Sequence, residues 1–301
     1  MDRAGHIYKW NLRTSAIACC LLAVCAFVGV AFGQTSDLLR QPWPELPNMV
    51  MLGPVSCRAD FPLVEIEEVQ QDITMLQTDL IRYLGIPEPQ EGIILCLFNT
   101  PEAYRNFVKR KYPMAPLDRP ALYIKAGGPG VLLVQRDSDM LLNIRHEMTH
   151  AYLNAALRNI PIWLDEGLAK YFETPQGQRG FDNPFLQSVQ KNASRLFGRA
   201  PSLERLEKLQ MIHQMGEREY RESWAWVHFL IHESPLSQKL LAFYLRSLTP
   251  ERQQGISMEQ SFVIQKSTPL TKLLETYLPD YRKDFVEHFK KWKPQQQLVI
   301  D

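Results

Sequence analysis

Residues 140–173 read MLLNIRHEMTHAYLNAALRNIPIWLDEGLAKYFE, and this stretch decides the architecture of the chain. Its first half carries apolar residues at three- and four-residue steps, the period of an amphipathic helix. Pro161 is suited to the start of a second helix, and the apolar residues that follow it indicate that this helix is largely buried. The sequence therefore predicts two consecutive helices at the centre of the protein.

The first of these helices contains the motif H-E-x-x-H, at residues 146–150. His146 and His150 are four residues apart, so both imidazoles lie on one helical face and can reach one cation. Glu147 lies about 100° further round the helix, where it can take a proton from water without being a ligand. Zinc is the expected metal, because it accepts imidazole and carboxylate ligands and leaves one position for water. We predict one zinc ion, with Glu147 as general base.

A catalytic zinc site needs a third protein ligand. The extended motif H-E-x-x-H-x-x-G-x-x-H is excluded, because Leu153 and Ala156 stand where it requires Gly and His. The second helix offers Asp165 and Glu166 among apolar residues, where a carboxylate is costly unless a cation receives it. The residues favour Glu166 as the ligand. The main alternative is that Asp165 is the ligand. The other alternative is that Glu166 is an ordinary exposed acid.

The segments HEMTH (146–150) and WLDEGLAKYFE (163–173) together resemble the gluzincin metallopeptidases, and in particular compact bacterial peptidase MA-like proteins. The resemblance is strong over about residues 120–175 and general elsewhere. It implies a zincin-like fold and Glu166 as the third ligand. It also implies that Glu173 lies behind a ligand histidine and accepts its hydrogen bond. Asp165, next to Glu166, is a further candidate for such a supporting role. The alternative for Glu173 is a surface charge at a helix end. Asp165 stands where relatives often carry Asn, and the G-x-M-E-N signature of aminopeptidases is absent.

Two further elements are expected by comparison with gluzincins. These enzymes use a Tyr or His beyond the glutamate helix as a donor to the developing oxyanion. Tyr220, at the start of a predicted helix, is our candidate, with a core tyrosine as the alternative. His228 lies on the same face as Tyr220 and is predicted to be a core histidine. The strand Val131–Gln135 is a candidate edge strand for binding extended peptide, or else an ordinary hairpin arm.

The rest of the chain predicts an α+β fold. A small mixed α/β N-lobe (49–137) ends in a strand pair that leads into a mainly helical C-lobe (138–292), which carries the H-E-x-x-H helix. Together the lobes form one zincin-like catalytic domain, 49–292. Residues 34–48 are polar and Pro-rich and read as a linker, and residues 293–301 as a tail. The elements expected in the N-lobe are strands at 49–52 and 93–98, helices at 62–84 and from Pro101, and a hairpin of 122–125 with 131–135.

Amino-acid composition narrows the possible classes of function and partner. The 301 residues are 45% hydrophobic and 22% charged, with 34 basic and 33 acidic side chains. This near-neutral balance is typical of a globular protein and does not favour a nucleic-acid partner. Cys57 and Cys96 are the two cysteines beyond the N-terminal segment, and they predict either a disulfide or two buried thiols.

The N-terminus has the pattern of a targeting segment. Arg3, Lys9 and Arg13 precede an apolar run, 16–32, that ends in small residues. This pattern predicts a secretory signal, 1–33, removed after Gly33. An uncleaved membrane anchor formed by residues 15–33 is the alternative. We therefore expect an exported protein, periplasmic or extracellular, whose only membrane contact would be this segment.

These features together predict an exported zinc metallopeptidase that acts on a peptide or protein substrate. No organic cofactor is expected. The alternative from another class is a zinc-binding interaction or envelope-assembly module with little hydrolytic activity. A metal-free helical structural protein is a second alternative.

Overall fold

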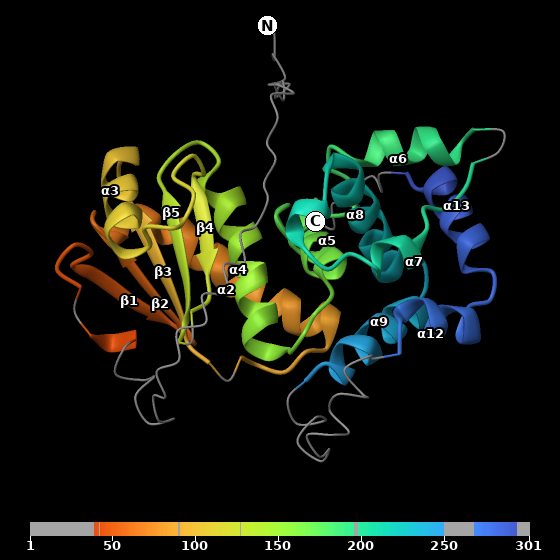
Figure 1. Ribbon diagram of the computed structural model, residues 1–301, viewed down its shortest axis with the longest axis horizontal. Coiled ribbons are helices and arrows are strands. Elements are labelled where there is room, and N and C mark those ends of the chain that lie inside the picture. Colours follow the sequence, from red (N-terminus) through yellow and green to blue (C-terminus); the bar gives the residue numbers. More distant parts are fainter. Residues whose placement is uncertain are drawn as a thin grey trace, which may run out of the picture.

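Five strands form a mixed sheet in the computed structural model of the protein, which describes residues 39–41, 43–89, 91–126, 128–195, 198–249 and 268–293. Their order is β1-β2-β3-β5-β4 (Figure 1). The central strands β2, β3 and β5 are parallel, and β1 and β4 pair antiparallel at the two edges. The strands are β1 (Asn48–Leu52), β2 (Val55–Ala59), β3 (Ile93–Phe98), β4 (Ala121–Ile124) and β5 (Gly130–Gln135). The predicted hairpin is β4 with β5.

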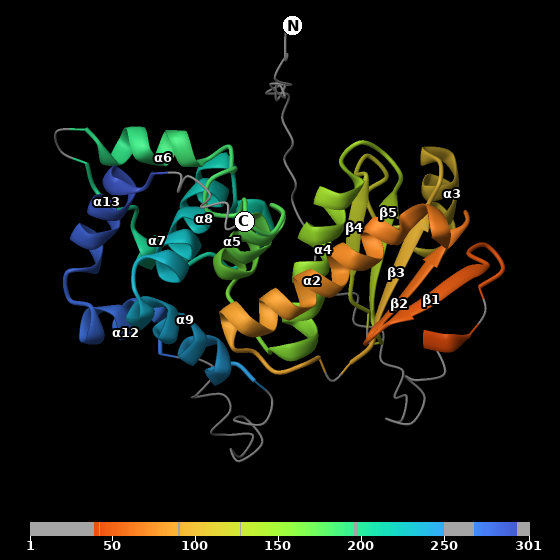
Figure 2. The ribbon, with the colours of Figure 1, turned by 180° about the vertical axis from the view of Figure 1, so that it is seen from behind.

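Helices cover both faces of this sheet. One face packs against α3 (Pro101–Lys111), and the other against α2 (Glu67–Leu84) and α4 (Met140–Ala156), as Figure 2 shows from behind. A short 3-10 helix, η1 (Leu63–Ile66), precedes α2. Every residue of β2 and β3 is buried, which is the expected pattern for parallel strands between two helical layers.

The helix boundaries follow local chemistry. The side chain of Thr100 accepts a hydrogen bond from the backbone N–H of Ala103, and Pro101 occupies the first position of α3. At its C-terminal end, α2 is followed by Gly85. The φ angle of Gly85 is +60°, a conformation that favours glycine. These two boundaries agree with the helices expected from the sequence, one ending at residue 84 and one starting at Pro101.

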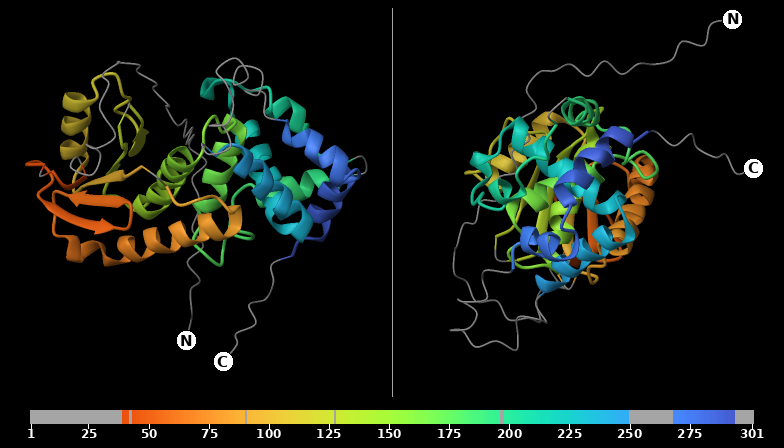
Figure 3. Two further views of the ribbon diagram at one scale, coloured as in Figure 1. Left: turned by 90° about the horizontal axis from the view of Figure 1, so that it is seen from below. Right: turned by 90° about the vertical axis from the view of Figure 1, so that its right-hand side faces the viewer.

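The C-lobe is built from helices. α5 and α8 pack closely against each other, and α8 also contacts α9 and α13. α2 runs from beneath the sheet to α9 (Figure 3), where Nε of Arg246 donates a hydrogen bond to the carbonyl oxygen of Gly85 at 3.0 Å. One buried apolar cluster continues from the sheet through α2, α4 and α5 into this lobe. The elements are α5 (Ile162–Phe172), α6 (Leu186–Ala193), α7 (Leu203–Leu206), η2 (Ile212–Gln214), α8 (Glu217–His232), α9 (Pro235–Ser247), α12 (Leu270–Tyr277) and α13 (Tyr281–Lys291).

The architecture is therefore the predicted one, a small mixed α/β lobe followed by a mainly helical lobe that contains the H-E-x-x-H helix. The predicted signal segment, 1–33, and residues 294–301 of the predicted tail lie outside the described residues. Among the helices that are described, none combines the length and apolar character needed to span a bilayer.

The segment 34–48 is not a loose linker where the structure describes it. Both terminal nitrogens of the buried Arg58 side chain donate hydrogen bonds at 2.6 Å, to the carbonyl oxygens of Gln41 and Leu39. Trp43 stacks on Phe107 of α3, and the Arg58 guanidinium lies over the ring of Trp43. A buried arginine must find acceptors, and this part of the chain supplies them. The prediction of a linker is wrong for these residues.

The expectation that Val131–Gln135 is an edge strand is also wrong. Strand β5 contains these residues and pairs with β3 on one side and with β4 on the other. Its backbone groups are therefore used within the sheet and cannot accept another strand. The strand at this edge of the sheet is β4.

The two cysteines lie on neighbouring strands but face opposite ways. In the register of β2 and β3, Cys57 is paired with Leu95, and Cys96 with Arg58. Successive side chains of a strand point to opposite faces, and the two thiols accordingly belong to different apolar clusters. Both are free and buried, and burial raises the pKa of Cys57 to about 12. Of the two alternatives from the sequence, the buried thiols are correct.

Gly167 sets the distance between α5 and α8. A Cβ atom at this position would lie 2.8 Å from the carbonyl oxygen of Ser223 and 3.0 Å from Cγ2 of Val227. Both contacts are on α8, and the first is with rigid backbone. The absence of a side chain at Gly167 therefore lets α8 approach the helix that carries Glu166.

Replacing Gly167 with alanine is expected to lower the free energy of unfolding by about 1–3 kcal/mol, because overpacking forces the helices apart. Thermal or urea unfolding measures the change. Gly128→Ala is the matched control, since no atom lies within 4 Å of a Cβ placed there. Equal stability of the two variants would contradict the close approach of α5 and α8.

Candidate metal centre

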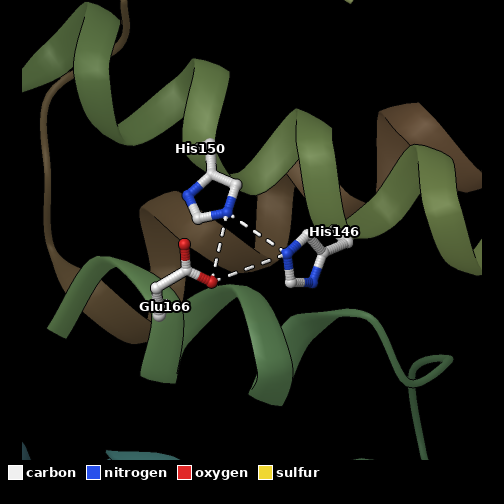
Figure 4. A group of neighbouring side chains, drawn as sticks. All are labelled: His146, His150 and Glu166. Carbon is white, nitrogen blue, oxygen red and sulfur yellow. Dashed lines mark hydrogen bonds and ion pairs between the residues drawn. The ribbon is translucent and has the colours of Figure 1, made fainter. Parts of the chain in front are cut away.

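Two consecutive helices bring the candidate ligands together. His146 and His150 project from α4 toward α5, and Glu166 projects from α5 to meet them (Figure 4). The i, i+4 spacing places the two rings one above the other, with centroids 4.9 Å apart. All three side chains are buried, and one possible ligand atom of each lies within 4.8 Å of the others.

The distances between these atoms fit a small cation. Nε2 of His146 and Nε2 of His150 are 3.2 Å apart, and each lies 3.8 Å from Oε2 of Glu166. Three atoms at these separations lie on a circle with a radius of about 2.1 Å, which matches the Zn–N and Zn–O distances of about 2.0–2.2 Å. Two imidazoles and one carboxylate are also the donor set of many catalytic zinc sites.

Carboxylates behind the histidines fix which nitrogen of each ring faces the centre. Nδ1 of His146 is 2.9 Å from Oε2 of Glu173, and Nδ1 of His150 is 3.1 Å from Oδ2 of Asp165. The hydrogen bond to Glu173 places the proton of a neutral His146 ring on Nδ1, and the adjacent carboxylate of Asp165 favours the same tautomer for His150. Both Nε2 atoms then present lone pairs to each other at 3.2 Å. A cation between them turns this repulsion into coordination.

The environment of Glu166 also favours a cation. Burial raises the pKa of Glu166 to about 8; His150 opposes this shift, and the negative charges of Asp165 and Glu147 add to it. Among the described residues, no donor forms a hydrogen bond to Oε2 of Glu166. A buried carboxylate oxygen without a donor is costly. A metal ion at this position would compensate for the missing donor, so the residues present fit the expected zinc.

The other residues singled out from the sequence take distinct places. Asp165 lies against Nδ1 of His150, away from the three candidate ligand atoms. Glu147 is buried and close enough to Glu166 for its charge to raise that pKa. Tyr220 is buried in the first turn of α8, the helix that packs against α5. His228 is fully buried and bonded to His288 and to the carbonyl oxygen of Gly180, so the prediction of a core histidine is confirmed.

Two basic residues that the sequence reasoning missed hold Glu173 in place. Lys170 donates to the same Oε2 atom of Glu173 that His146 uses, at 2.9 Å. Nε of Arg145 donates to the carbonyl oxygen of Glu173 at 2.6 Å, and its Nη1 donates to Asp72 of α2 at 2.8 Å. Burial alone would raise the pKa of Glu173, but Lys170 and His146 hold it below its usual value. The sequence contained one signal for the first of these contacts, because Lys170 and Glu173 are three residues apart on an apolar helix, a spacing that allows an ion pair.

Glu173→Gln is expected to lower zinc affinity by about 10- to 100-fold, because the acceptor behind His146 loses its charge. Competition with a chromogenic chelator measures the change. Glu275→Gln provides the control, since Glu275 forms an exposed pair with Lys272 at the same i, i+3 spacing. Zinc affinity that stays the same in both variants would show that Glu173 does not support the site.

A family model described as "Protein of unknown function (DUF1570)" matches residues 141–249, which include the metal centre and α8. No curated protein matches the chain. Among solved structures, the chain is similar to the crystal structure of an M1 zinc metallopeptidase from Deinococcus radiodurans, with 15% identity and a TM-score of 0.41. The match covers 83% of this chain and 52% of that one, so the chain spans about half the length of that enzyme.

Proposed function

We propose that the protein is a zinc-dependent hydrolase that cleaves peptide bonds. The observation that carries this proposal is the set of three buried atoms, Nε2 of His146, Nε2 of His150 and Oε2 of Glu166, whose spacing fits one zinc ion. When bound, zinc would polarise the scissile carbonyl and lower the pKa of a coordinated water to about 7.

The chain supplies the remaining chemistry. Glu147 follows His146 directly and is not one of the three candidate ligands, and we assign its carboxylate as the base. It accepts the proton of the attacking water and then transfers this proton to the leaving amine. Glu173 and Asp165 hold the imidazoles in the orientation that exposes Nε2. Burial of the group lowers the local dielectric, which strengthens each of these electrostatic effects.

Tyr220 is our proposed donor to the oxygen of the carbonyl under attack. Tyr220 lies on α8, about one turn before Ser223. Ser223 packs against Gly167 of α5, the residue that follows Glu166. Tyr220→Phe is therefore expected to lower kcat by about 10²- to 10³-fold with zinc content unchanged. Steady-state kinetics with Tyr277→Phe as the control tests this, because Tyr277 is exposed on α12. Full activity in Tyr220→Phe would make Tyr220 a core tyrosine only.

The experiment that tests the function combines metal analysis with peptide profiling. Purified protein is analysed for zinc and incubated with a mixed peptide library, with and without chelator. We expect about one zinc per chain and cleavage that the chelator abolishes and added zinc restores. Bound zinc without turnover would favour the interaction or envelope-assembly module. Absence of zinc would favour the metal-free structural protein.

Export to the periplasm or the extracellular space is part of the proposal. It is supported by the basic head, the apolar run and the small-residue end of residues 1–33. In this reading the substrate is an extracytoplasmic peptide or protein.

A further inference from the structure

A surface cavity of about 420 Å³ is lined by residues of α6, α8 and α13, by Arg195 and by residues 198–202. Four arginines line it: Arg195, Arg199, Arg218 and Arg221. Such a concentration of one charge stands out in a chain whose net charge is +1. Converging guanidinium groups bind carboxylate and phosphate groups through paired N–H donors.

The acids near the cavity do not balance these arginines. Glu222 is the acid in the lining, and it already accepts hydrogen bonds from Arg218, at 2.8 Å, and from Arg205. Arg221 lies 3.6 Å from Glu217, which is 80% exposed and outside the lining. Within the described part of the chain, Arg195 and Arg199 form no ion pair. The cavity therefore keeps an excess of positive charge.

The cavity also has an apolar wall and is separate from the metal centre. Ala200 and Pro201, which are half-buried, contribute apolar surface beside the arginines. On α8, the face that contacts α5 carries Ser223 and Val227, whereas the cavity lies on a different face of the helix. A volume of about 420 Å³ is typical of small-molecule sites, which range over roughly 300–1,000 Å³.

We propose that this cavity binds a small organic anion, with its carboxylate or phosphate group held by the arginines and its apolar body against Ala200 and Pro201. Calorimetric titration of the whole chain with phenyl phosphate and with benzoate tests the proposal. Both anions are expected to bind saturably and more weakly at high salt, and neutral benzyl alcohol is expected not to bind. Inorganic phosphate that binds as tightly as phenyl phosphate would overturn the role of the apolar wall.

Variants locate the binding. The double change Arg195→Gln with Arg199→Gln is expected to weaken phenyl phosphate binding by about tenfold or more, whereas Arg105→Gln on α3 leaves it unchanged. Glu222→Gln removes the carboxylate from the lining and is expected to tighten binding, a gain that misfolding cannot imitate. Unchanged affinity in the double variant overturns the proposal. Binding that disappears in Glu166→Ala assigns the anion to the metal instead, and also overturns it.

Discussion

Replacing Glu147 with glutamine is expected to leave about one zinc per chain and to lower kcat for peptide hydrolysis by about 10²- to 10⁴-fold. Glutamine has nearly the same shape as glutamate but cannot accept the proton of the attacking water. The three candidate ligand atoms belong to other residues, so the metal is expected to remain. Zinc analysis and steady-state kinetics on the same preparation measure both quantities.

Glu102→Gln is the control for this experiment, because Glu102 lies exposed at the start of α3 and pairs with Arg105. A Glu147→Gln protein with full activity would remove the general-base role. A variant that loses its zinc as well as its activity would instead make Glu147 part of the metal centre's support, and the proposed mechanism would need another base.

Removing Glu166 is expected to have the largest effect on metal binding. Glu166→Ala takes away the carboxylate that completes the three-atom set with the two histidines. Zinc affinity should fall by more than about 100-fold, beyond the range seen for residues that only support a ligand. Competition with chelators of graded affinity measures this fall.

Asp165→Asn is the matched comparison, since Asp165 is the neighbouring acid on the same helix. Its side chain lies behind Nδ1 of His150, and asparagine retains a carbonyl oxygen there that can still accept a hydrogen bond. We therefore expect this variant to keep most of its zinc. The opposite pattern, with zinc kept in Glu166→Ala and lost in Asp165→Asn, would make Asp165 the ligand.

Features that depend on local geometry could be predicted from the sequence. The i, i+4 spacing of His146 and His150 follows from the helical repeat alone. The helix end at residue 84 and the helix start at Pro101 depend on nearby backbone groups and were predicted for the same reason. The placement of Glu166 required more, because two neighbouring acids were available. Their position on a largely apolar helix favoured Glu166, and the resemblance to gluzincins supported the same choice.

Features that depend on distant partners could not be predicted. Nothing within residues 131–135 shows that β5 has a strand on each side, since strand order is set by the whole sheet. Leu39 and Gln41 are held against the sheet because the buried side chain of Arg58, on β2, donates hydrogen bonds to their carbonyl groups. Likewise, Arg145 is tied to Asp72, 73 residues earlier in the chain, and only the fold brings them together.

In the proposed zinc enzyme, the buried carboxylate of Glu166 would link the amount of folded protein to the supply of zinc. An ion that binds the native state and not the unfolded chain stabilises the fold by mass action, by about 2.7 kcal/mol when its free concentration is 100 times Kd. Here the same ion would also satisfy a buried oxygen that no described donor reaches. In a zinc-poor environment the apoprotein would unfold more readily and be open to proteolysis, so its abundance would follow metal availability.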